Sequence, residues 1–187
     1  VAGYCRRWRR ALVAGLVSLA VARMMVVPVQ MMQRAQSVPK IHDITTDLAN
    51  PPVFIALAAA REAAPNAVDY PGEDTARQQR AAYPNIKPIT LDITLASAMT
   101  ALQDTVRQQG WKIAAVTENS IEATDTTRWF GFKDDVVIRL RETDKGLQID
   151  MRSASRVGKS DVGTNAARIH DFFSALVQRV NKGDGDN

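Results

Sequence analysis

Apolar and polar residues alternate along several short segments in the second half of the chain. Ile89, Leu91 and Ile93 alternate with polar neighbours, which is the pattern of a half-buried strand. The same alternation predicts strands over residues 111–116, 121–128, 136–141 and 147–152. Asp144-Lys145-Gly146 separates the last two segments and predicts a hairpin turn. The last four strands therefore follow one another closely enough to form an antiparallel meander.

Two longer segments repeat apolar residues every three or four positions, as amphipathic helices do. The first runs from Thr94, a favourable N-cap residue, to Gly110, which is placed to follow the helix end. The second is capped by Ser160 or Asp161. Its apolar stripe consists of Ile169, Phe172, Phe173, Leu176, Val177 and Val180. Phe172 and Leu176 are expected to be buried beneath the sheet.

The order β-α-β-β-β-β-α predicts an α+β domain over residues 86–181. Each helix has one apolar face, so we expect both to cover the same face of the antiparallel sheet. The fold is helix-grip-like if the last helix lies across the sheet. A ferredoxin-like arrangement is the alternative, and it requires a helix between the middle strands.

The N-terminal segment, residues 1–32, has the features of a membrane anchor or a signal segment. Four arginines precede an uncharged run at residues 11–22, and Arg23 separates it from a second apolar run at 24–32. Cleavage near Ala22 fits a signal peptide, whereas residues 12–32 are long enough for a membrane helix. Both interpretations keep the arginines cytoplasmic and export the remainder. We expect the bacterial inner membrane with a periplasmic domain, or secretion to the periplasm after cleavage. The chain begins with Val, which also allows a fragment lacking earlier membrane helices.

Residues 33–85 are rich in proline and polar groups and predict an extended linker. Pro51 and Pro52 precede an alanine-rich stretch, 53–64, which predicts a short helix within it. The C-terminal residues 182–187, KGDGDN, predict a disordered tail.

The charge of the chain is divided unevenly. Residues 1–40 hold seven basic groups and no acid, whereas residues 41–187 hold 17 basic and 20 acidic groups. A nucleic-acid partner is therefore not expected, since phosphate binding needs positive charge clustered on the folded domain. The single Cys5 cannot form an internal disulfide. No spacing of the two histidines or of Cys5 predicts a metal site, and no catalytic motif, metal or cofactor is expected.

Two stretches concentrate polar and aromatic residues, and we predict that they meet in space. The first contains Arg128, Trp129, Asp134 and Asp135. The second contains Arg152, Ser153, Arg156, Ser160, Asp161, Asn165 and Arg168, where a strand passes into a helix N-terminus. Such a surface would bind an acidic ligand, an anion or a partner. The alternative is structural: a strand edge and a capped helix joined by ion pairs to Asp134 or Asp135.

The same stretches carry a family resemblance. Ile41 to Asp47, Asn50 to Phe54, Tyr70 to Gly72, Thr127 to Asp135, Arg152 to Gly158, and Ser160-Asp161 with Asn165 to Ile169 resemble the bacterial family called domain of unknown function family 1499. The likeness covers residues 38–180 and implies an envelope or membrane location and no known catalysis. The second half also resembles the helix-grip domains of the outer-membrane assembly lipoprotein BamC, although the lipid-attachment cysteine is lacking.

These observations favour a non-enzymatic binding or scaffold domain that faces the periplasm. Its partners would be the membrane, through the N-terminal segment, and an envelope protein or anionic ligand. Two alternatives remain: a binder of a lipid or amphiphile, which needs a cavity between the sheet and the last helix, and an enzyme acting on an anionic envelope substrate.

Overall fold

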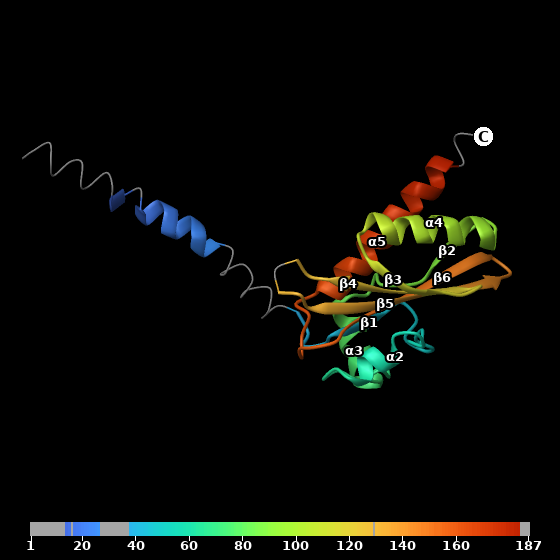
Figure 1. Ribbon diagram of the computed structural model, residues 1–187, viewed down its shortest axis with the longest axis horizontal. Helices are drawn as coiled ribbons and strands as arrows, with labels where there is room; N and C mark the ends of the chain where they lie inside the picture. The colour runs from blue at the N-terminus through green and yellow to red at the C-terminus, as the bar shows by residue number, and fades with distance from the viewer. Residues whose placement is uncertain (1–13, 16, 27–37, 129, 184–187) are drawn as a thin grey trace, which may run out of the picture. The chain divides into compact units, whose positions relative to one another are not determined.

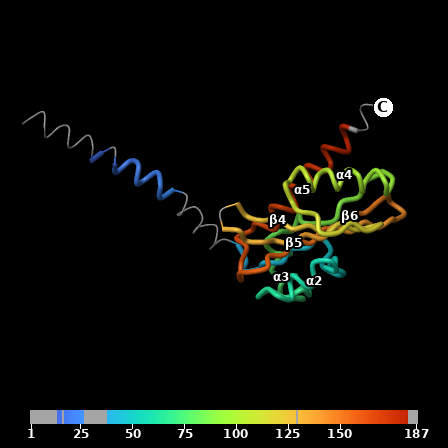
Figure 2. Tube along the Cα trace, in the orientation of Figure 1, coloured from blue at the N-terminus to red at the C-terminus, as the bar shows by residue number. Residues whose placement is uncertain are grey.

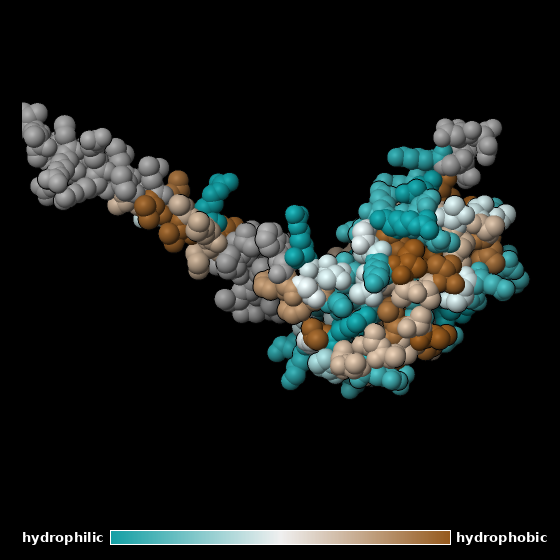
Figure 3. Space-filling model, viewed as in Figure 1, coloured by the Kyte–Doolittle hydropathy of each residue, from teal (hydrophilic) through white to brown (hydrophobic). Residues whose placement is uncertain are grey.

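The computed structural model describes residues 14–15, 17–26, 38–128 and 130–183, in two compact units, Val1–Val38 and Pro39–Asn187 (Figure 1). In the first unit, residues 14–15 and 17–26 are helical and expose apolar side chains, brown and tan in Figure 3. Much of the expected membrane or signal segment at residues 1–32 lies outside the described residues. No helix within the described residues is both long enough and apolar enough to cross a membrane.

The second unit is an α+β fold built on an antiparallel sheet of six strands. Its described elements are, in order, β1 (Asp43–Thr45), α2 (Ala58–Glu62), α3 (Glu73–Ala82), β2 (Ile89–Leu91), α4 (Leu95–Gln108), β3 (Lys112–Val116), β4 (Ser120–Thr126), β5 (Lys133–Thr143), β6 (Gly146–Ser155) and α5 (Thr164–Gly183). The strand order is β1-β6-β5-β4-β3, and β2 also pairs with β6. Helices α4 and α5 pack on one face of the sheet (Figure 1). The predicted α+β class and sheet with two helices on one face are confirmed.

The capping residues and the glycine predicted from the sequence lie at the helix ends where they were expected. The Thr94 hydroxyl accepts a hydrogen bond from the Ser97 backbone N–H and caps α4. Gly110, with φ of 76°, follows the end of α4 in the left-handed region that glycine adopts without strain. The Asp161 carboxylate accepts from the backbone N–H groups of Gly163 and Asn165 at the start of α5.

The apolar core lies between the sheet and helices α4 and α5. Phe172 and Leu176 are fully buried, as the helical spacing predicts. The Phe172 ring stacks on the Trp111 ring with centroids 5.2 Å apart. Val136, Ile138 and Leu140 point into this core from alternate positions of β5; the buried residues of β6 on the same face are Leu147, Ile149 and Met151.

The segment expected to be a linker, residues 33–85, is from Ile41 onward part of the fold. β1 pairs with β6 in the register Asp43↔Ala154, and Ile41 and Ile44 are buried in the core. α3 adds a second helix where the sequence predicts loop. The prolines prevented a long helix as expected, but a three-residue strand is too short to show alternation. At the other end, α5 extends through Gly183, and residues 184–187 lie outside the described residues.

Both faces of the sheet are therefore covered. We call the face under α4 and α5 the helix face. The opposite face, which carries α2, α3 and their connections, we call the charged face (Figures 1 and 2). Its apolar contacts are small in number: Phe54 and Leu57 pack on Val137 and Ala154.

Candidate functional site

The two predicted stretches meet through the pairing of β5 with β6. Asp134 lies opposite Ser155, and Asp135 lies opposite Ala154. Successive residues of a strand point to opposite faces of the sheet. The two adjacent acids therefore enter different buried clusters, one on each face, rather than one shared polar surface.

Asp134 belongs to a polar cluster on the helix face, beside the start of α5. The Arg168 guanidinium donates to Asp134 Oδ2 at 2.6 Å and to Asp125 Oδ2 at 2.8 Å. It also donates to the Ser153 hydroxyl and to Asn165 Oδ1. Ser153 is fully buried and itself donates to Asn165 Oδ1 at 2.7 Å. This cluster fastens α5 to the sheet.

Asp161 and Ser160 cap the same end of α5. The Ser160 hydroxyl accepts from the Val162 backbone N–H at 3.3 Å. Burial raises the pKa of the Asp161 carboxyl above its ordinary value, and the backbone N–H groups of Asn165 and Gly163 oppose that rise. Neither residue is placed as an anion site, since their oxygens already occupy the helix N-terminus.

Asp135 forms a second cluster on the charged face. It accepts from Arg61 at 3.1 Å, from Arg156 at 2.8 and 2.9 Å, and from the Thr124 hydroxyl at 2.8 Å. Arg61 and Asp135 are both fully buried. Burial lowers the pKa of Arg61, and the bond to Asp135 opposes that change. Asp135 is buried and pairs with two cations, so loss of both partners would leave a buried unpaired charge, which is costly.

Arg152 is held by a partner that sequence reasoning did not identify. Its guanidinium donates to the two Asp43 oxygens at 3.0 and 2.8 Å, and also to the backbone carbonyls of Pro52 and Val68. Arg61 and Arg152 both contact the Phe54 ring, with their guanidinium carbons 4.7 and 4.8 Å from its centroid. Both contacts are cation–π contacts. The acidic partners expected for the arginine cluster were Asp134, Asp135 and Asp161. Asp134 pairs with Arg168, Asp135 pairs with Arg61 and Arg156, and Asp161 caps α5.

Glu122 on β4 holds the turn before α2 on the charged face. Its carboxylate accepts three backbone N–H groups, from Ile55, Ala56 and Leu57, each at 2.9 Å. Those groups form the turn that leads into α2. A carboxylate at this point satisfies donors that the short helix leaves open.

Arg128 and Trp129 lie in the connection between β4 and β5. Arg128 is exposed and makes an interaction with the rest of the chain. Trp129 lies outside the described residues.

An open pocket of about 660 Å³ lies where the edge of the sheet is divided. β1 pairs with residues 152–154 of β6, and β2 pairs with residues 147–149 of the same strand. The chain between β1 and β2 therefore leaves this edge of the sheet and returns to it further along. The Gln79 side chain closes the outer side of β1, donating to the Thr45 carbonyl at 2.6 Å and accepting from its N–H at 3.1 Å. The pocket is left beside these contacts.

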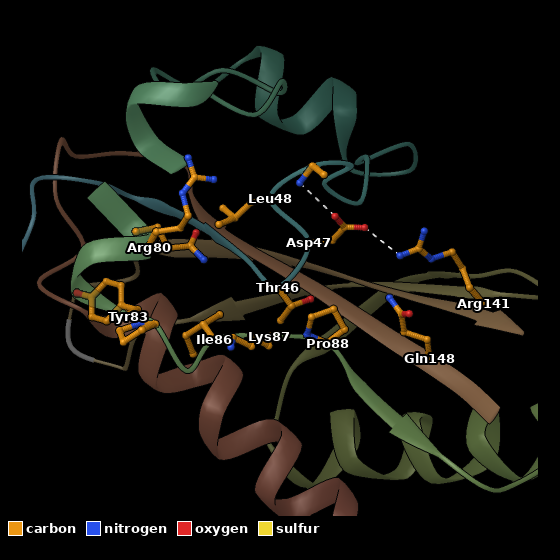
Figure 4. A pocket seen from close by; sticks show the side chains of 13 residues that line it. Thr46, Asp47, Leu48, Arg80, Tyr83, Ile86, Lys87, Pro88, Arg141 and Gln148 are labelled. Carbon is orange, nitrogen blue, oxygen red and sulfur yellow. Dashed lines mark hydrogen bonds and ion pairs between the residues drawn. The ribbon is translucent and has the colours of Figure 1, made fainter. Parts of the chain in front are cut away.

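Cations and apolar groups line this pocket together. Its cations are Arg80, Lys87 and Arg141, and its one carboxylate is Asp47. Arg141 donates to Asp47 at 2.9 Å, and Arg139 donates to the same carboxylate at 3.1 Å. Figure 4 shows Leu48 and Asp47 between Arg80 and Arg141, with Ile86, Lys87 and Pro88 below them. Lys87 is exposed and has no ion-pair partner among the described residues.

Sequence reasoning missed this pocket because most of its residues come from the segment interpreted as linker, residues 33–85. Arg141 and Gln148 were placed on strands, and Arg141 pairs both with Asp150 on β6 and with Asp47 in the segment interpreted as linker. The signal was present in β5, where Val137, Arg139 and Arg141 alternate with core residues. Two cations on the outward face of a strand indicate a further charged layer.

The centre of the space between the sheet and α5 is filled, and an open pocket of about 450 Å³ lies at its edge, between α5 and residues 85–89. Phe172, Leu176 and Ile169 fill the centre and are at most 1% exposed. Within the part of the chain that the structure describes, no group of three His, Cys, Asp or Glu residues is arranged to hold a metal ion.

The family model described as Protein of unknown function (DUF1499) matches residues 43–176. The chain belongs to this family. The DUF1499 match begins at β1 and includes α2 and α3, so it covers both faces of the sheet. Among curated proteins, none matches the chain.

Proposed function

We propose that this DUF1499 protein is a non-enzymatic binding module of the bacterial envelope. Its N-terminal segment holds it at the inner membrane, and its α+β domain faces the periplasm. The arginine-rich leader without acids supports this topology. The resemblance to the helix-grip domains of BamC is in keeping with a binding role, although fold alone does not fix function.

The pocket at the divided sheet edge is the proposed binding site. The supporting observation is its lining: three cations around Leu48, Tyr83, Ile86 and Pro88, in a volume suited to a small molecule. Arg80 pairs with Glu73, but its side chain remains 52% exposed. Arg141 pairs with Asp47 and Asp150, but its side chain remains 39% exposed. Arg61 and Arg152 are buried within their ion pairs and are not accessible to a ligand. A ligand with a phosphate or carboxylate next to an apolar chain matches this lining. We therefore assign an anionic amphiphile as the ligand class.

Binding of octyl phosphate tests the ligand class. The full chain should bind octyl phosphate and octanoate below their micellar concentrations, and neutral octyl glucoside much more weakly, in isothermal titration calorimetry. Lys87→Gln should weaken octyl phosphate binding about tenfold, the value of one lost charged hydrogen bond. The matched control is Lys112→Gln, an exposed lysine on β3, which should leave the affinity unchanged. Equal affinity for the neutral compound would contradict the proposal.

The topology has a separate test. A reporter enzyme that is active only after export, fused after Asn187, should be active in a bacterial host. Activity of only a cytoplasmic reporter at the same position would contradict the periplasmic assignment. Cleavage near Ala22 would instead yield a chain that carbonate washes from membranes.

A further inference from the structure

One end of the domain exposes apolar side chains beside lysines. Phe130 and Phe132, in the connection between β4 and β5, are 76% and 52% exposed, and their rings stack at 5.7 Å. Val157, after β6, is 38% exposed. Lys40, Lys133 and Lys159 are exposed as well. We call these six residues the aromatic–basic end.

Backbone hydrogen bonds bring the aromatic–basic end together. The Thr127 N–H donates to the Phe132 carbonyl at 2.8 Å, which closes the loop that carries the two rings. The Arg156 N–H donates to the Lys133 carbonyl at 3.0 Å, next to Val157. The Asp161 N–H donates to the Ile41 carbonyl at 3.2 Å, which places residues 40–41 beside the β6–α5 connection.

The acids in or next to these connections are engaged in ion pairs or in a helix cap. Asp134 and Asp125 pair with Arg168, Asp135 pairs with Arg61 and Arg156, and Asp161 caps α5. The lysines therefore face solvent without the carboxylates of their own loops neutralising them. Exposed aromatic rings flanked by basic side chains are the combination found at the headgroup level of anionic bilayers.

The short segment that joins the N-terminal apolar run to the domain also favours a membrane as the partner of this end. The domain begins at Pro39, next to Lys40, and the predicted apolar segment ends at Met32. Residues 33–39 span at most ~25 Å when extended. If residues 11–32 lie in a membrane, this end of the domain stays within reach of its surface.

We propose that the aromatic–basic end docks on the anionic surface of the membrane that holds the chain, with Phe130 and Phe132 inserted among the headgroups and the lysines against phosphates. This inference rests on the proposed function, because it takes the membrane location from it. It adds the surface that orients the domain on the bilayer. The pocket lies elsewhere, on the segments around β1, α3 and β2.

Quenching by brominated lipid tests the docking. The full chain with Cys5→Ser and Val157→Cys is labelled with bimane at position 157. It is then placed in vesicles of phosphatidylcholine and phosphatidylglycerol with brominated acyl chains. The label should lose most of its fluorescence. A label at Asp144→Cys, on the exposed β5–β6 turn at the other end of the same strands, should keep it. Similar fluorescence at both positions would overturn the docking.

Two sets of variants separate the aromatic and the basic contributions. Phe130→Ser with Phe132→Ser should reduce quenching at position 157 to the level at position 144. The matched control is Val53→Ser with Ile55→Ser, which removes two other exposed apolar side chains and should leave quenching unchanged. Lys133→Gln with Lys159→Gln should abolish the dependence on phosphatidylglycerol. Equal quenching in the aromatic variants and the control would overturn the role of the rings.

Two further readouts distinguish other outcomes. Octyl phosphate binding is measured on the same samples. Absence of quenching at position 157 in the chain with Phe130, Phe132 and the lysines intact, with octyl phosphate binding retained, would overturn the docking and leave the proposed function standing. Excimer emission from a pyrene label at position 157, without bromine quenching, would show a second copy as the occupant and overturn the lipid assignment. Unchanged melting temperatures of the serine and glutamine variants confirm that they fold.

Discussion

The two faces of the sheet use the same strands but opposite chemistry. On the helix face, alternate residues of β5 and β6 are aliphatic and bury against α4 and α5. On the charged face, the intervening residues include Asp135, Arg139 and Arg152, which pair with Arg61, Asp47 and Asp43. Asp150 on the same face pairs with arginines of β5. Burial of apolar surface stabilises the helix face, whereas ion pairs stabilise the charged face.

The difference determines how each face responds to mutation. Burial of apolar area is non-directional, so the helix face depends on volume and packing. Burying charged groups has a desolvation cost, and the attraction within an ion pair offsets that cost only when both partners are present. The charged face should therefore tolerate exchange of a whole pair better than loss of one member. The following predictions test that contrast from the largest expected effect to the smallest.

Truncation of Phe172 should have the largest effect. Phe172→Ala removes a fully buried ring that stacks on Trp111 and leaves a cavity under the sheet. We expect a loss of roughly 3–5 kcal/mol in the free energy of unfolding, measured with urea. Phe130→Ala, which truncates a ring 76% exposed, is the control and should change little. A loss below about 1 kcal/mol at Phe172 would mean that the helix face does not depend on its volume.

Removal of Arg152 should cost about 3 kcal/mol, because Asp43 stays buried without its partner. The loss is read from urea unfolding. Arg107→Ala, from an exposed ion pair with Asp104, is the control and should be nearly neutral.

A paired exchange sharpens that result. Arg152→Met with Asp43→Leu removes both charges and should be less destabilising than Arg152→Ala alone. A double variant as unstable as the sum of the single variants would show that the charged face is not governed by pairing. It would then resemble the helix face, where each residue contributes its own area.

The sequence predicted the helix face much better than the charged face. Periodic apolar residues from Leu95 to Val106 and from Ile169 to Val180 identify helices directly, because one face of each is buried. The charged face lacks such a signal: Asp43 and Phe54 lie in short, proline-rich segments far along the chain from Arg152. Their roles depend on which segments the fold brings together, and charge alone does not specify a partner.

Glu122 offers a smaller test on the charged face. Glu122→Gln keeps the size of the side chain but places an amide NH₂ where an oxygen accepts from the Leu57 backbone N–H. We expect a loss of about 1.5 kcal/mol in the free energy of unfolding, since a hydrogen bond to a charged group is removed. Glu118→Gln, on an exposed turn, is the control. An unchanged stability would show that the turn before α2 does not need the carboxylate.

The smallest effect concerns the pH dependence at the start of α5. Burial raises the pKa of the Asp161 carboxyl in the folded protein, so the folded state binds its proton more tightly than the unfolded state does. The contribution of this group to stability is therefore full below its ordinary pKa of about 4 and declines as pH rises through the raised value. Asp161→Asn does not titrate. The stability difference, wild type minus Asp161→Asn, should accordingly become less favourable to wild type from pH 4 to pH 7, by urea unfolding. Asp144→Asn, on an exposed turn, should show no such trend. A difference that grows with pH would mean that the N–H groups of Gly163 and Asn165 outweigh burial, so that the helix face depends on a charge at this one point.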